Sequence, residues 1–72
     1  MQYASITLRN KSYLDCWIYV GVIEVYYLCA KYEIRIKVPK DENVYAVSSK
    51  QNIKHLGTIP QEIQYLEIFF EV

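Results

Sequence analysis

The chain has 72 residues, which is enough for one domain and excludes two nucleotide-binding halves, a strand–helix barrel or a large substrate cleft. Hydrophobic residues make up 53% and charged residues 22%, with two glycines and two prolines, so a folded domain over 1–72 is expected instead of disorder. Eight basic and eight acidic side chains give no net charge, and the basic excess typical of a duplex-DNA-binding protein is absent.

Hydrophobic and polar residues alternate along the first part of the chain, as in strands with one buried face. A first strand is predicted over 3–9, with Ala4, Ile6 and Leu8 on one side, and the polar residues 10–12 then form a turn. Two further strands, 14–20 and 22–29, flank Gly21 and predict a hairpin.

The charged residues favour one register of this hairpin. Pairing Ile18 with Ile23 keeps Glu24 outside, whereas a shift by one residue would bring Glu24 opposite Ile18 in the core. The same register places Cys29 ~13 Å from the position that pairs with Cys16, at ~3.3 Å per residue, which is beyond disulfide reach. The other predicted pairs are Cys16 with Val25, Leu14 with Tyr27, Trp17 with Glu24 and Asp15 with Tyr26.

The clearest strand pattern covers 32–38, and Pro39 ends it because proline donates no ladder hydrogen bond. A turn over 39–43 then leads to a partner strand, 44–48. Within the first of these strands, Tyr32, Ile34, Ile36 and Val38 are predicted to face inward, and Glu33, Arg35 and Lys37 outward.

Residues 48–57 are predicted to form a loop that contains the only candidate for a short helix. Ser48 or Ser49 would cap its start and Gly57 its end, and Ile53 and Leu56 lie three residues apart. Pro60 closes this loop, and a last strand is predicted over 62–72. Its inward residues would be Leu66, Ile68, Phe70 and Val72, and its outward residues Glu67 and Glu71.

These elements predict an all-β protein of about six strands, either a small antiparallel sandwich or a partly open barrel. The order and spacing of three segments, which cover about half of the chain, resemble those of the small immunoglobulin-like modules of the PEGA type. Lys40-Asp41-Glu42, however, stands where such a module has a Pro-Gly turn. The resemblance concerns topological rhythm and assigns no family; its segments are 6–10, 17–21 and 32–39.

Residues able to support catalysis or bind a metal are scarce. His55 is the only histidine, and no Cys-x-x-Cys or His-x-x-x-His spacing occurs. Cys16 and Cys29 fall on positions predicted to face the core, where a thiol is inert. We therefore expect no enzyme activity, no metal and no cofactor.

The apolar run 16–30 is shorter than the ~20 residues of a membrane-spanning helix and contains Glu24, so two strands are the better interpretation. The first nine residues have no charged-then-apolar leader. These features predict a cytoplasmic protein with reduced thiols and no membrane partner.

An aromatic excess on the outer side of the predicted hairpin indicates protein binding. Trp17, Tyr19 and Tyr26, joined by Tyr3, are the predicted partner-binding residues, because Trp and Tyr are enriched in binding hot spots. The competing interpretation folds the loop 49–61 over this side as a second core. We predict a non-catalytic protein-binding module, a homodimer, that occupies a partner's surface, as accessory proteins of phages and mobile elements often do.

The alternative function is that of a small barrel binding single-stranded nucleic acid, with tyrosines as stacking platforms and basic residues along the backbone. Its contacts would be Arg35 and Lys37 on one strand face, and Lys50 and Lys54 in the following loop. This function is disfavoured because Glu33 interrupts the basic face and the chain has no positive excess.

Overall fold

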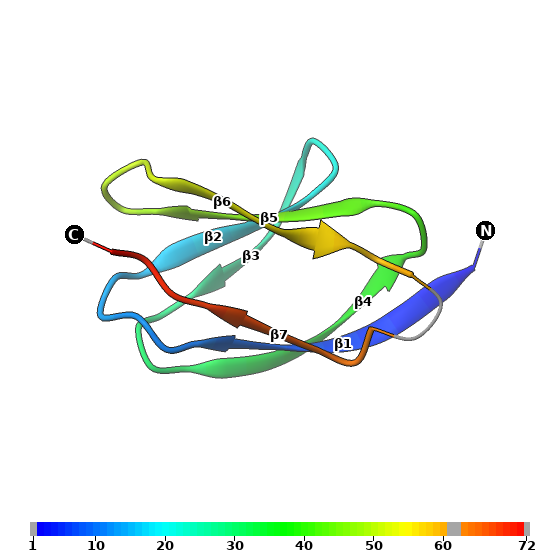
Figure 1. The fold of residues 1–72 in the computed structure, drawn as a ribbon, viewed down its shortest axis with the longest axis horizontal. Helices are drawn as coiled ribbons and strands as arrows, with labels where there is room; N and C mark the ends of the chain where they lie inside the picture. Colours follow the sequence, from blue (N-terminus) through cyan, green and yellow to red (C-terminus); the bar gives the residue numbers. More distant parts are fainter. Residues whose placement is uncertain (1, 61–62, 72) are drawn as a thin grey trace.

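The computed structural model describes residues 2–60 and 63–71, which form two sheets packed face to face (Figure 1). One sheet has three strands in the order β4-β1-β7, and the other has four in the order β3-β2-β5-β6. The predicted small all-β sandwich is confirmed. The strands are β1 (Tyr3–Asn10), β2 (Cys16–Val20), β3 (Ile23–Leu28), β4 (Glu33–Pro39), β5 (Asn43–Ser48), β6 (Ile53–Thr58) and β7 (Tyr65–Ile68).

Alternation along the central strands creates the core between the sheets. Because successive side chains of a strand point to opposite faces, every second residue of β1, β2, β4 and β5 is turned inward. The buried hydrophobic residues of these four strands are Ile6, Leu8, Cys16, Ile18, Val20, Ile36, Val38, Val44 and Ala46. Leu14, Leu28, Ile59, Ile68 and Phe70 complete the core.

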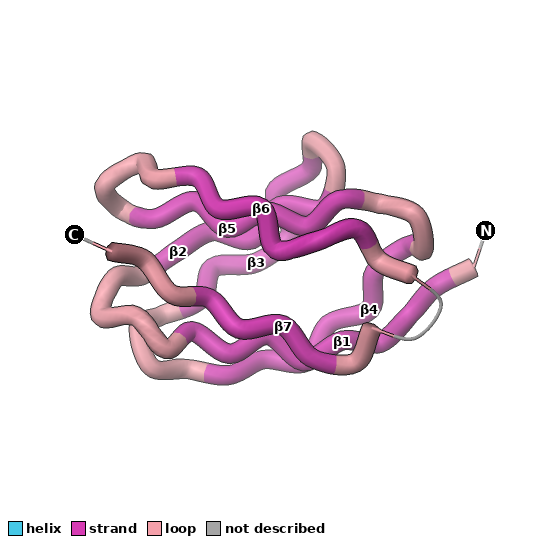
Figure 2. Tube along the Cα trace, in the orientation of Figure 1, coloured by secondary structure: helices cyan, strands magenta, loops and turns pink. Residues whose placement is uncertain are grey.

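The three-stranded sheet is organised around β1. Antiparallel pairing with β4 sets Ile6 opposite Ile36, and parallel pairing with β7 sets Leu8 beside Leu66. Figure 2 shows β1 running between strands that come from distant parts of the chain. The parallel pair departs from the purely antiparallel sandwich that the sequence predicts.

The predicted helix over 48–57 is wrong, since residues 53–58 form β6, paired antiparallel with β5. Ser48 does cap backbone groups, because its hydroxyl accepts hydrogen bonds from the N–H groups of Lys50 and Asn52, both at 3.2 Å. These bonds stabilise a hairpin turn instead of a helix start. Gln51 completes the turn in the left-handed region, with φ of 62°.

The predicted hairpin register is also wrong. The two-residue turn Gly21-Val22 pairs Val20 with Ile23, and Gly21 takes a φ of 63° that favours glycine. A bulge then inserts one extra residue into β3, so that Ile18 lies opposite Tyr26. The predicted pairing of Ile18 with Ile23 left a four-residue turn over 19–22, so the tighter turn shifts the register by two residues and the bulge shifts it by one more. The observed pairs are Cys16 with Leu28, Trp17 with Tyr27 and Tyr19 with Glu24.

The last predicted strand is shorter than expected, since β7 ends at Ile68. Ile68 and Phe70 are buried as predicted, and Glu67 and Glu71 are exposed. Glu62 and Val72, the ends of the predicted strand, lie outside the described residues. Tyr32, predicted to face inward, is exposed because β4 begins after it.

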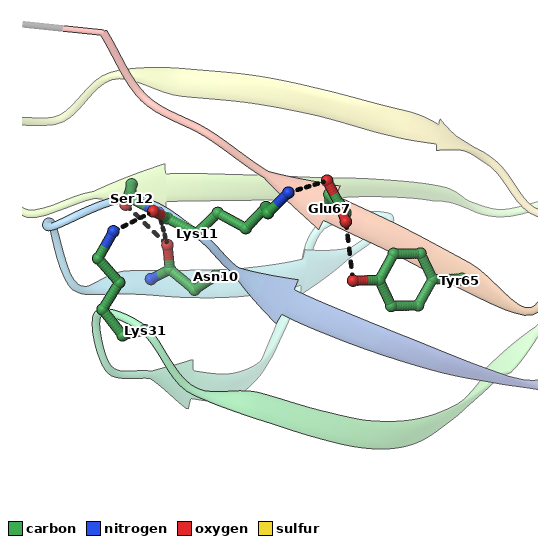
Figure 3. Close-up of polar contacts among 6 residues, drawn as sticks. All are labelled: Asn10, Lys11, Ser12, Lys31, Tyr65 and Glu67. Atoms are coloured by element: carbon green, nitrogen blue, oxygen red, sulfur yellow. Dashed lines mark hydrogen bonds and ion pairs between the residues drawn. The ribbon is translucent and has the colours of Figure 1, made fainter.

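A buried side chain ties the sheets together at one end. The Asn10 amide donates to the carbonyl oxygens of Leu14 at 2.8 Å and Cys29 at 3.3 Å, and its oxygen accepts from the Ser12 hydroxyl at 2.7 Å. Beside it, the Lys31 ammonium donates to the Lys11 carbonyl oxygen at 2.6 Å (Figure 3). Since Asn10 ends β1 and Cys29 follows β3, these bonds join the two sheets.

Candidate protein-binding surface

The outer face of the four-stranded sheet carries hydrophobic side chains where a polar surface is usual. Cross-strand pairing aligns Tyr27, Trp17, Val47 and Ile53 in a row across all four strands. The Trp17 and Tyr27 rings lie 5.4 Å apart at a 55° tilt, a favourable geometry for an aromatic pair. Ile53, at the end of the row, is 73% exposed.

A second row runs alongside the first on the same face, two residues away along β2, β5 and β6. It contains Glu24, Tyr19, Tyr45 and His55. The Tyr19 hydroxyl donates to the Glu24 carboxylate at 3.2 Å, and the Tyr45 and His55 rings lie 5.0 Å apart. Partial burial, followed by the bond to Glu24, raises the pKa of Tyr19. Within the row, the Tyr19 hydroxyl and Glu24 are thus hydrogen-bonded to each other, whereas His55 Nε2 lies 2.9 Å from the Asn43 side-chain oxygen.

Asp15 lies at the edge of the first row, where it fixes Tyr27. Its carboxylate accepts hydrogen bonds from the Tyr27 hydroxyl and from the Ala30 backbone N–H. The bond from Tyr27 is the main cause that lowers the pKa of Asp15. The same bond raises the pKa of Tyr27 to about 12, because it holds the phenol in its protonated form. The Tyr27 ring is thereby held beside Trp17.

The structure brings together two of the four predicted partner-binding residues, Trp17 and Tyr19. Tyr26 does not share their face, because the bulge in β3 turns it to the inner side opposite Ile18 and puts Tyr27 in its place. Tyr3 belongs to the other sheet, where the Lys37 ammonium lies 5.2 Å from its ring centre. Ile53 was missed because β6 was expected as a loop or helix. Tyr45 and Val47 lie on β5, which was predicted as a strand without its faces being assigned.

The four basic residues predicted for nucleic-acid contact do not share one face. Arg35 and Lys37 lie on the outer face of the three-stranded sheet, opposite Thr7 and Ser5. Lys50 is in the β5–β6 turn, and the Lys54 ammonium donates to the Phe69 carbonyl oxygen at 2.8 Å. Lys54 and His55 are neighbours in β6 and therefore point to opposite faces of the sheet.

The two cysteines occupy different surroundings. Cys16 is buried, and burial raises the pKa of its thiol to about 11. Cys29 is only half-buried, so its predicted core position is wrong. It follows Leu28, the cross-strand partner of Cys16, and the predicted ~13 Å separation is therefore also wrong, since successive residues rise ~3.3 Å. Both thiols are free.

A groove of about 350 Å³ opens at the tip of the β2–β3 hairpin. Its walls are mostly apolar and come from residues 20–23 and Val25 of the hairpin, with Lys37, Pro39 and Glu42 on the far side. The groove could not be predicted from local sequence patterns, because its walls come from separate parts of the chain.

Within residues 2–60 and 63–71 no group of three histidine, cysteine or carboxylate side chains is placed to hold a metal ion. No helix in that part of the chain is long and apolar enough to cross a membrane. No protein-family model matches the chain, and comparisons with curated proteins and with solved structures find no match.

Proposed function

We propose that the chain is a non-catalytic protein-binding module that self-associates through the outer face of the four-stranded sheet and acts by occupying a partner's surface. The observation that supports this function is the pair of rows described above, with Trp17 and Tyr19 at their centre. Tryptophan and tyrosine dominate binding energies when they lie centrally in a patch. Val47 pairs with Trp17 on one side, and the exposed Ile53 lies beyond it at the end of the row.

The competing interpretation, a second core under residues 49–61, is weakened by the position of β6. This strand extends the sheet sideways from β5 and does not fold over Trp17. A domain of this size buries only ~60% of the surface that its unfolded chain exposes, so it gains from burying more in a dimer. In a two-fold dimer the same patch is used twice, so that one substitution removes two contacts.

Light scattering on the purified chain at high micromolar concentration tests the proposal. The wild type should be a dimer, and Trp17→Lys and Ile53→Lys should each be folded monomers, with dissociation constants raised at least tenfold for a ΔΔG of ~1.4 kcal/mol or more. Ile53 is the safer site, because a side chain 73% exposed is not needed for folding. Tyr13→Lys is the matched control, since Tyr13 is 58% exposed in the loop before β2.

A monomeric wild type contradicts the proposal, and so does an Ile53→Lys protein that remains as dimeric as the Tyr13→Lys control. The cytoplasm is the proposed location, which the free Cys16 and Cys29 support because cytosolic thiols stay reduced.

Single-stranded nucleic-acid binding is the second candidate, because Trp17, Tyr19 and Tyr45 share one sheet face and bases can stack on such rings. It ranks lower because the basic residues are divided between faces, which leaves no track for a phosphate backbone. Binding to a labelled oligonucleotide that weakens steeply with salt would favour it over the leading proposal.

A further inference from the structure

The two layers of the sandwich differ in width by one strand. β6 and β7 lie in contact at one side, so the free edges at the other side are β3 of the four-stranded sheet and β4 of the three-stranded sheet. Counting from the contacting side, the three-stranded sheet ends before it reaches β3. Part of β3 therefore has no layer opposite it.

The exposure of the β3 side chains agrees with the missing layer. Ile23 and Tyr26 lie opposite the buried Val20 and Ile18, so their register positions belong to the inner side of the sheet. They are nevertheless 67% and 43% exposed. Leu28 at the far end of β3 is buried, beside the hydrogen bonds of Asn10. The uncovered part is thus the half of β3 nearest the hairpin tip.

The groove of about 350 Å³ lies at this uncovered half. Val25 and Ile23 form its wall on β3, and Lys37 and Pro39 form its wall on β4. Its volume falls in the ~300–1,000 Å³ range of ligand sites. Because β4 is an edge strand, alternate backbone N–H and C=O groups along it have no strand partner within residues 2–60 and 63–71. An apolar wall and a free strand edge therefore face the same space.

We propose that this space takes an extended strand of a partner protein, which pairs with the free edge of β4 and buries its inward side chains against Ile23, Val25 and Tyr26. Strand addition of this kind obtains affinity from main-chain hydrogen bonds and specificity from alternate side chains. The added strand would be the fourth of the narrower sheet and would make the two layers equal in width. The edge of β3 is less suited to pairing, because its bulge interrupts the ladder.

Charge identifies the chemistry of the partner strand. The outward residues of β4 are Glu33, Arg35 and Lys37, an excess of one positive charge, and Lys37 lines the groove. Opposite charges on neighbouring strands stabilise a sheet, so the incoming strand carries acidic residues outward and aliphatic residues inward.

The other edge of the same sheet already holds a strand of this type. β7 turns Leu66 and Ile68 inward, and its outward Glu67 lies beside Arg9 in the register and contacts the Lys11 ammonium at 3.2 Å, as Figure 3 shows. A segment that alternates aliphatic and acidic residues would repeat this arrangement at β4.

Two synthetic peptides test the proposal: one alternates glutamate and valine, and the other alternates lysine and valine. At low salt, the acidic peptide should bind the full chain at least tenfold more tightly than the basic peptide does. It should also slow hydrogen exchange of β4 amides more than of β3 amides. The double variant Arg35→Glu, Lys37→Glu should reverse the preference between the peptides. Both side chains are exposed on an outer face, so this variant is expected to fold.

Val25→Asp should weaken binding of the acidic peptide at least tenfold, whereas Tyr13→Asp, in the loop before β2, should leave it unchanged. The proposal is overturned if neither peptide binds at millimolar concentration, if the charge reversal does not change the preference, or if slowed exchange appears in β3 alone. Self-association that is lost in Val25→Asp but kept in Ile53→Asp would assign the groove to a second copy and also overturn it. These outcomes are separate from the dimer test, which depends on Trp17 and Ile53.

Discussion

The two outer faces of this sandwich are built in opposite ways. On the three-stranded sheet, Arg9 lies between Glu33 and Glu67, and Glu67 also accepts a hydrogen bond from the Tyr65 hydroxyl at 2.9 Å. That bond, followed by the one from Lys11, lowers the pKa of Glu67. On the four-stranded sheet, the corresponding positions hold Trp17, Tyr27, Val47 and Ile53.

This difference shows that the fold alone does not require an aromatic outer face. The outer face of the three-stranded sheet carries mainly charged and hydroxyl side chains, with Tyr3 and Tyr65 among them, and such a face is sufficient for a sheet exposed to water. The outer face of the three-stranded sheet can therefore serve as a reference for the outer face of the four-stranded sheet. The excess of apolar side chains on the second face has to be explained by something other than the sandwich, and binding is the explanation we propose.

The largest effect is expected from the core below the charged face. Ile36→Ala should lower the free energy of unfolding by about 2–4 kcal/mol, because Ile36 is buried and its truncation leaves a cavity. Arg35→Ala, one residue away on the outer face, should change it by less than ~0.5 kcal/mol. Urea titration measures both. Equal losses would mean that this outer face contributes to folding as the core does.

A smaller effect is expected from the polar link on the aromatic face. The Tyr27–Asp15 hydrogen bond needs a protonated phenol and an ionised carboxylate. Since the pKa of Tyr27 is raised to about 12, its contribution to stability is complete below the ordinary tyrosine value of ~10 and is lost as the pH rises through about 12. Since the pKa of Asp15 is lowered, its contribution is complete above the ordinary aspartate value of ~3.9 and is lost as the pH falls through the lowered value.

NMR titration of the tyrosine ring carbons follows Tyr27 directly. In Asp15→Asn its pKa should return toward ~10, while the pKa of Tyr19 stays raised. If the Tyr27 pKa is unchanged in this variant, Asp15 is not what holds the ring beside Trp17.

The smallest effect is expected for the reactivity of the two cysteines, one on the inner face and one beyond the end of an edge strand. Cys16 should react slowly with a maleimide at pH 8, because it is buried and its thiol has a pKa of about 11. Cys29, half-buried and beyond the end of β3, should react faster. Mass spectrometry of the labelled protein distinguishes the two, with Cys29→Ser as control. Equal rates would show that this end of the hairpin opens as a unit.

Strands that carry no extra residue could be predicted from the sequence, whether they lie at a sheet edge or in its centre. For β4, strict alternation and a terminal Pro39 were enough to identify both faces, because a regular ladder preserves the period of two. The placement of Trp17 and Tyr19 outside followed from the same rule in β2.

The irregular elements could not be predicted, for physical reasons that differ between them. The bulge in β3 adds a residue with no distinctive sequence pattern, and it exchanged Tyr26 for Tyr27 on the outer face. In β6, Ser48 signals capping in both a helix and a hairpin turn, so a local rule cannot separate them. The groove depends on the relative widths of two sheets, which no local pattern records.

The parallel pairing of β1 with β7 has a consequence for how the protein folds. The register joins Thr7 to Tyr65, so the central strand of the narrower sheet must wait for a segment made much later during synthesis. Such contacts close long loops before they return any stabilisation, and proteins dominated by them fold in milliseconds to seconds instead of microseconds. On the ribosome, one flank of β1 thus stays unpaired until the segment around Tyr65 has emerged.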